Sequence, residues 1–117
     1  MAERDKTIDQ LLQAREAFDR RDWALAFDSL RNASDLGPQD TLTMATAAYL
    51  LGDADEAIRT LQAGYQDRIK NADALGAVRF ACWLGMVLNT RGEVAVGGGW
   101  IARAHRLLET EPEDIVE

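Results

Sequence analysis

The chain has 117 residues, of which 47% are hydrophobic, and carries a formal net charge of −7. These values predict one soluble domain with a continuous core and exclude global disorder. The acidic charge argues against direct nucleic-acid binding, and no apolar run approaches the ~20 residues of a membrane span.

Cys82 is the only cysteine, so an internal disulfide is excluded. The first residues are charged and do not form a secretory signal. Both observations favour a reducing, cytoplasmic location.

Apolar residues recur at helical spacing, and no segment alternates with the period of a strand, so the whole chain is expected to be α-helical. In chain order, helices are expected over residues 5–20, 22–36, 39–51, 53–66 and 71–90, with a sixth that ends at Pro112. Gly37-Pro38 is expected to end the second helix, and Asp53 to cap the fourth. The start of the sixth helix is left open, because Gly97, Gly98 and Gly99 each cost about 1 kcal/mol relative to Ala.

Similar segments begin at Arg21, Gly52 and Gly92, at offsets of 31 and 40 residues, which lie in the range of helical repeats. They predict three antiparallel helical hairpins over residues 5–36, 39–66 and 71–110, stacked within a single domain. Small residues are expected where paired helices approach: Ala14, Ala17, Ala26, Ala45, Ala48, Ala57, Gly85 and Gly97. Larger apolar residues are expected to fill the space between hairpins: Phe18, Leu30, Leu61, Trp83, Leu84 and Ile101.

The spacing of small residues resembles that of tetratricopeptide repeats (TPRs). The matching residues are Ala14, Ala26, Ala33 and Pro38 in the first repeat, Ala45, Gly52 and Ala57 in the second, and Gly85, Gly92 and Ala104 in the third. The aromatic residue expected early in each repeat is absent, since Gln10, Thr41 and Ala81 stand there. The resemblance implies a right-handed TPR-like α-solenoid.

Three further segments resemble the helical-repeat part of LuxR-type bacterial transcription regulators. They are Arg79 to Gly85, Arg91-Gly92-Glu93, and Gly98 to Ala104, and the opening Ala14 to Trp23 is similar. In that family the repeats precede a DNA-binding helix-turn-helix, which this sequence does not contain. The resemblance implies a regulatory role for a repeat region without its DNA-binding domain.

No catalytic set, cofactor loop or metal-ligand set is found, so the chain is not expected to be an enzyme or to hold a cofactor. His105 is the single histidine and is expected to lie at the surface. Cys82 is expected to be a buried structural thiol. The acidic residues Asp53, Asp55 and Glu56 lack the spacing of a calcium loop, and capping is expected instead.

The expected function is therefore a non-catalytic interaction or regulatory module. A protein or peptide partner would lie in a concave groove lined by Gln10, Gln13, Thr43, Thr46, Tyr49, Arg79 and Asn89. A homodimer would form through an uncapped apolar end made of Trp100, Ile101, Leu107 and Leu108. The alternative is a small-molecule-sensing domain whose ligand binds between hairpins.

Overall fold

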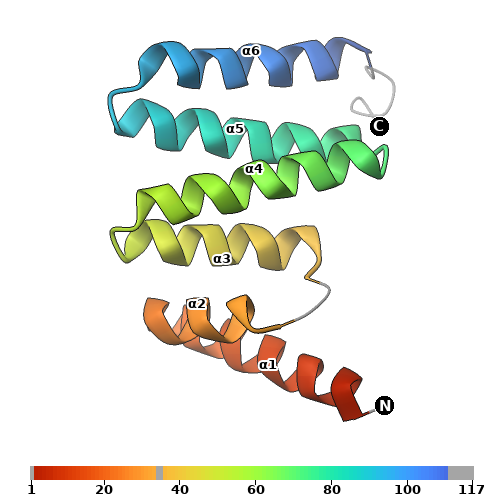
Figure 1. Ribbon diagram of the computed structural model, residues 1–117, viewed down its shortest axis with the longest axis vertical. Coiled ribbons are helices and arrows are strands. Elements are labelled where there is room, and N and C mark those ends of the chain that lie inside the picture. The colour runs from red at the N-terminus through yellow and green to blue at the C-terminus, as the bar shows by residue number, and fades with distance from the viewer. Residues whose placement is uncertain (1, 34–35, 111–117) are drawn as a thin grey trace. The chain divides into compact units, whose positions relative to one another are not determined.

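The computed structural model describes residues 2–33 and 36–110, and the regular secondary structure within them is all α-helix, as expected from the sequence. Six helices follow one another in the described residues: α1 (Ala2–Asp19), α2 (Trp23–Arg31), α3 (Pro38–Leu50), α4 (Ala54–Lys70), α5 (Ala74–Thr90) and α6 (Val94–Thr110) (Figure 1). Side chains are described from Ile8 to Glu109, apart from residues 34 and 35.

Two helix boundaries differ from the prediction because of local capping. Helix α2 ends at Arg31, where the side-chain amide of Asn32 donates to the Asp28 carbonyl at 2.9 Å. Gly37-Pro38 does not end this helix; it begins α3, with Gly37 as the N-cap and Pro38 in the first turn. Proline is well suited to that position because the first N–H groups of a helix have no partner within the helix.

The junction of α4 and α5 also differs from the prediction. Helix α4 continues to Lys70, and α5 begins at Ala74 after the N-cap Asp73, whose carboxylate accepts from the Gly76 N–H at 2.9 Å. The sixth helix begins directly at Val94 and includes all three glycines. Pro112, its expected end, lies outside the described residues.

The same tight turn joins the helices at four junctions. A residue with positive φ, at Arg21, Gly52, Ala72 and Gly92, is followed by an acidic residue whose N–H bonds back to the carbonyl five positions earlier. At the α3–α4 junction, for example, the Asp53 N–H donates to the Ala48 carbonyl at 2.9 Å. This pairing satisfies carbonyls at the helix end that would otherwise lack partners. The repeated sequence segments mark three of the four turns and miss the one at Ala72.

The chain forms two compact units, residues 1–60 and 61–117, which divide within α4. In the first unit, α2 packs against both α1 and α3. The fully buried Ala17, Ala26 and Ala47 form its centre, and the rings of Phe18 and Trp23 meet edge to face beside it, 5.0 Å apart. Arg15 of α1 donates through Nε and Nη2 to the two carboxylate oxygens of Asp40 on α3, at 3.3 and 3.1 Å.

In the second unit, α5 lies between α6 and the second half of α4, and glycines face it from both neighbours. A Cβ built on Gly64 of α4 would lie 2.4 Å from the Phe80 ring of α5. On the other side, a Cβ on Gly97 of α6 would lie 2.9 Å from the Gly85 carbonyl oxygen. Helices α5 and α6 therefore approach closely because neither residue has a side chain at the contact.

The burial expected for the small residues is confirmed. The six alanines expected at the helix contacts are at most 2% exposed, and Gly85 and Gly97 are buried. Leu30, Leu61 and Leu84 are also buried, while Phe18 and Ile101 are half-buried. The prediction for Trp83 is wrong, because this side chain is 41% exposed on the outer side of α5.

Candidate functional site

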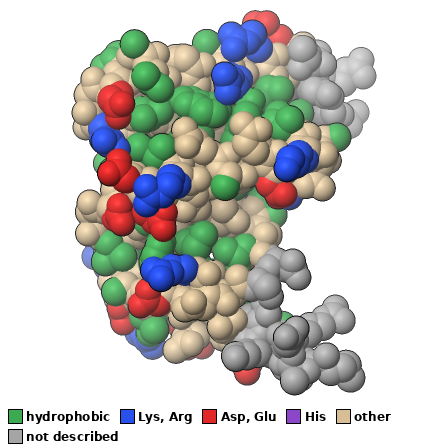
Figure 2. All heavy atoms as spheres, in the orientation of Figure 1, with side chains coloured by type: hydrophobic (Ala, Val, Ile, Leu, Met, Phe, Trp, Pro, Cys, Tyr) green, Lys and Arg blue, Asp and Glu red, His purple; other side chains and the backbone are tan. Residues whose placement is uncertain are grey.

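The most distinctive surface of the described residues is an exposed row of side chains along α5. Leu75, Arg79, Trp83 and Met86 are spaced by four, four and three residues, so they lie on one face of the helix. Leu75, Trp83 and Met86 are 49%, 41% and 54% exposed. We call these four residues the α5 stripe. Figure 2 shows hydrophobic side chains gathered over α5 and α6 on the face that it presents.

The other sides of α5 are packed against neighbouring helices, and this packing keeps the α5 stripe at the surface. Phe80 is buried against Gly64 of α4, and Gly85 is buried against α6. Leu84 and Ala81 are fully buried between these contacts. The stripe is therefore carried on a helix that is held from two sides, so the backbone that presents its side chains is already ordered before a partner binds.

The composition of the stripe is that of a binding surface. Trp, Met and Arg are enriched in protein–protein interfaces, and Trp and Arg supply a large share of hot-spot residues. Arg79 was expected in the groove, and sequence reasoning missed Leu75, Trp83 and Met86. Leu75 and Met86 do lie at helical spacing from Arg79, but α5 has apolar residues on its other faces too, so this spacing alone did not single them out.

The other groove residues are placed on three helices. Gln10 and Gln13 lie on α1, half-buried and exposed respectively, and Tyr49 is exposed at the end of α3. The hydroxyls of Thr43 and Thr46 donate to the carbonyls of Gln39 and Leu42 within α3, at 3.0 and 2.8 Å. These bonds use the hydroxyl hydrogens and leave only acceptor capacity toward a partner.

Asn89 is exposed on α5, but its amide also lies against α6. A Cβ built on Gly97 would be 2.7 Å from the Asn89 Oδ1. The Asn89 side chain therefore packs beside the point where α5 and α6 come close together. Of the seven groove residues, the structure brings Arg79 into the α5 stripe, while Asn89 lies near the other end of the same helix.

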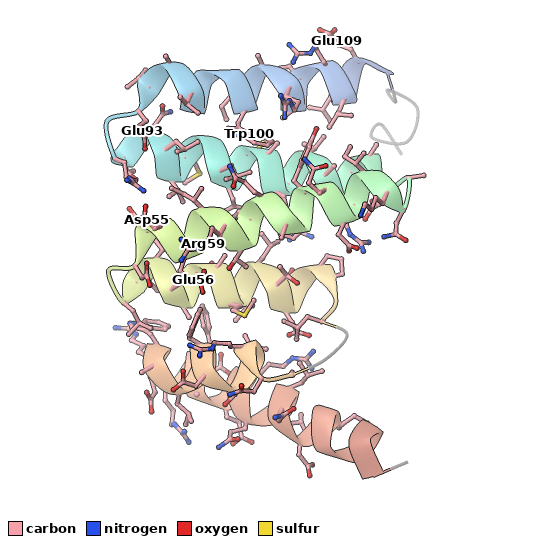
Figure 3. The ribbon with its side chains drawn as sticks, in the orientation of Figure 1. Asp55, Glu56, Arg59, Glu93, Trp100 and Glu109 are labelled. Atoms are coloured by element: carbon pink, nitrogen blue, oxygen red, sulfur yellow. The ribbon has the colours of Figure 1, made fainter. Side chains whose placement is uncertain are left out.

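The four residues expected to mediate self-association all lie on α6, with Ile101 on the side that faces α5. Trp100, Ile101, Leu107 and Leu108 are half-buried, and Figure 3 shows Trp100 on this side of the helix. A Cβ on Gly85 would be 2.5 Å from the Ile101 Cδ1, so Ile101 packs directly on α5. The Trp100 ring meets the Tyr65 ring of α4 edge to face, at 5.0 Å. Self-association through these four residues stays a prediction, and two of them, Trp100 and Ile101, already pack against other helices of the chain.

The acidic residues at the start of α4 act in capping and surface pairing, as expected. Asp53 accepts from the Glu56 N–H at 3.1 Å, and Glu56 accepts from the Arg59 Nε at 3.1 Å. Figure 3 shows Glu56 and Arg59 near the same end of α4. Asp53 therefore satisfies a helix N-terminus, and the Glu56–Arg59 pair is exposed on one helix.

Arg68 ties the end of α4 to the start of α5. Its guanidinium donates to Asp67 at 2.6 Å and to Asp73 at 3.2 Å. These hydrogen bonds, with Asp67 first and Asp73 second, raise the pKa of Arg68 above its ordinary value. The group therefore stays charged, and Asp73 serves both as the cap of α5 and as the acceptor from Arg68.

Side chains with catalytic or metal-binding chemistry are scattered in the part of the chain that the structure describes. His105 is exposed, as expected, and Cys82 is half-buried, where full burial was expected. Within residues 8–33 and 36–109, no three His, Cys, Asp or Glu side chains come together in a way that could hold a metal ion. None of the described helices combines the length and apolar character needed to cross a bilayer.

No family model matches this chain, and no curated protein or solved structure shows significant similarity to it.

Proposed function

We propose that this chain is a non-catalytic protein-interaction module that binds a protein or peptide through the α5 stripe. The observation that carries the proposal is the exposure of Leu75, Trp83 and Met86 beside Arg79 on one face of a firmly packed helix. A partner would insert a large apolar side chain between the stripe residues. Trp83 would be the main anchor, because it offers the largest contact area of the four.

The proposal includes a TPR-like array of three hairpins, α1–α2, α3–α4 and α5–α6. The four equivalent turns support it, since a repeated turn places successive helices in a repeated relation. In such an array the first helix of each hairpin lines the binding groove, and α5 is a first helix. The predicted groove residues on α1 and α3 remain candidate partner contacts within the first unit.

The biological setting of the proposal is regulatory and cytoplasmic. It draws on the resemblance of Arg79 to Gly85 and Gly98 to Ala104 to the repeat part of LuxR-type transcription regulators. In this setting the module would receive a partner protein and would not contact DNA itself. The net charge of −7 supports that division of roles.

The proposal can be tested by selecting peptides from a random twelve-residue phage library on the immobilised chain. Selected peptides are then synthesised, and their affinities are measured by isothermal titration calorimetry. Trp83→Ala and Met86→Ala are each expected to weaken binding at least tenfold, as hot-spot substitutions do. Circular dichroism should be unchanged, because both side chains are exposed.

Ile69→Ala is the matched control, because Ile69 is an apolar residue of α4 with 42% exposure outside the stripe. It should leave peptide affinity unchanged. Equal affinity of the selected peptides for wild type and Trp83→Ala would contradict the proposal. Failure to enrich any peptide over an uncoated surface would also count against it.

A further inference from the structure

A second surface feature lies on α6, and none of the residues that line it belongs to the α5 stripe. It is an open hollow with a volume of about 390 Å³, lined by Val96, Gly99, Trp100, Ala102, Arg103 and Arg106. Gly99 and Ala102 form the bottom of the hollow, because they have no side chain or only a methyl group. The longer side chains form its walls. This volume suits a small organic molecule better than a single inorganic ion.

The guanidinium of Arg103 is held in place by aromatic rings. Its central carbon lies 4.5 Å from the centre of the Trp100 ring and 5.8 Å from that of Tyr65. Tyr65 is itself only 6% exposed and fixes Trp100 from the α4 side. A guanidinium over ring faces keeps its N–H donors at the edge, where they can still bind an anion.

Arg106 adds a second cation to the same wall. It follows Arg103 by three residues, so the two side chains start on neighbouring positions of one helix face, about 5–6 Å apart. Among the described residues neither guanidinium forms an ion pair with a carboxylate. Within the part of the chain that the structure describes, both guanidinium groups therefore keep donors that can bind an anion.

The local charge favours an anion despite the acidity of the whole protein. Helix α6 (Val94–Thr110) itself contains two arginines, one glutamate, and no lysine or aspartate, which gives the helix a net charge of +1 in a chain of −7. The opposite end of the hollow is apolar, because Val96 is 54% exposed there. A ligand that matches both ends carries an anionic group on an apolar body.

We propose that the α6 hollow binds a small organic anion, with its carboxylate or phosphate held by Arg103 and Arg106 and its apolar body lying over Gly99 and Ala102 toward Val96. This site is independent of the α5 stripe. A ligand here would contact α6 directly and would reach α4 only through the Tyr65–Trp100–Arg103 stack.

The test is a titration of ¹⁵N-labelled protein followed by NMR, with octanoate and octyl phosphate as probes. Octanol and inorganic phosphate are titrated in parallel, because each supplies only one half of the proposed ligand. We expect the Trp100 indole N–H and the Arg103 and Arg106 Nε–H resonances to shift and saturate with an amphipathic anion. The two half-ligands should bind at least tenfold more weakly. The stronger of octanoate and octyl phosphate identifies the anionic group.

Arg106→Gln is the decisive variant, because Arg106 is exposed and lies outside the aromatic stack, so its loss should not disturb the fold. It should weaken binding of the preferred probe about tenfold, since a charge-assisted contact is removed. Arg31→Gln removes an equally exposed charge from α2 and should have no effect. Trp83→Ala should also have no effect, which separates this site from the peptide-binding stripe.

Three results would overturn the proposal. The first is equal affinity in wild type and Arg106→Gln. The second is an equal loss in Arg31→Gln, which would indicate general charge attraction. The third is a set of shifts that never saturates, or that maps away from both residues 96–106 and Tyr65.

Discussion

The two compact units hold their helices together by different means. In the first, the helices meet at the alanines Ala17, Ala26 and Ala47, and the ion pair Arg15–Asp40 joins α1 to α3. In the second, α5 and α6 meet at the glycines Gly85 and Gly97, where backbone lies directly against backbone. At an alanine contact, a methyl group separates the two helices. The wider spacing leaves room for an ion pair such as Arg15–Asp40 beside the contact. A glycine contact brings the helices closer, and any added atom must displace the backbone.

The largest effect is expected from an added methyl group at the glycine contact. Gly97→Ala should lower the free energy of unfolding by about 2 kcal/mol, because the new Cβ would lie 2.9 Å from the Gly85 carbonyl oxygen. Gly98→Ala is the matched control, since nothing lies within 4 Å of a Cβ at that position. It should raise the free energy of unfolding by about 1 kcal/mol through higher helix propensity. Urea unfolding followed by circular dichroism measures both, and the same sign for both variants would refute the close contact.

A smaller effect is expected from removal of the ion pair in the first unit. Arg15→Ala should lower the free energy of unfolding by about 1 kcal/mol, because the largely buried Asp40 carboxylate loses its bidentate donor. The Arg15 side chain is 58% exposed, which keeps the effect modest. Arg59→Ala, which removes an exposed pair within α4, should cost about 0.3 kcal/mol. A double-mutant cycle with Asp40→Asn that shows no coupling would contradict this role.

The smallest effect concerns the turns, which are alike in the two units. Ala72 adopts φ of 56°, a conformation that glycine reaches without steric cost. Ala72→Gly should therefore raise the free energy of unfolding by about 0.5–1 kcal/mol, in contrast to most glycine substitutions. Gly52→Ala should lower the free energy of unfolding by a similar amount, because Gly52 has φ of 89°, which is strained for alanine. Nothing lies within 4 Å of an added Cβ at this position, so no steric clash contributes to the effect. Thermal melts of the pair should shift in opposite directions, and a parallel shift would refute the equivalence of the turns.

The helical class and the burial of the small residues could be predicted because the relevant residues differ sharply in size. Ala26, Ala48 and Gly97 are small residues with larger apolar residues three or four positions away on the same helix. All three are buried. The turn at Ala72 was not predicted, because alanine carries no signal for positive φ. Its position follows only from the backbone bonds that end α4 and from the cap provided by Asp73.

The candidate site was harder to predict for a different reason. Helix α5 has apolar residues on nearly all sides, so periodicity alone does not distinguish Leu84, which is buried, from its neighbour Trp83, which is exposed. The distinction is made by the contacts of Phe80 with Gly64 and of Gly85 with α6, which involve residues distant in sequence. Arg79 could be assigned to the surface because a charged side chain is rarely buried without a partner.

The three successive glycines of α6 have a consequence for how the molecule opens. Two of them, Gly98 and Gly99, face open space and make no contact that would offset their low helix propensity. Helix α6 therefore depends on its packing against α5 and has little tendency to persist alone. In hydrogen–deuterium exchange, we expect the backbone amides of α6 to lose protection before those of α5, as a separate opening step with lower free energy than global unfolding. The end of the chain that carries Trp100 and Arg103 would thus behave as a detachable segment, ordered only while it stays docked.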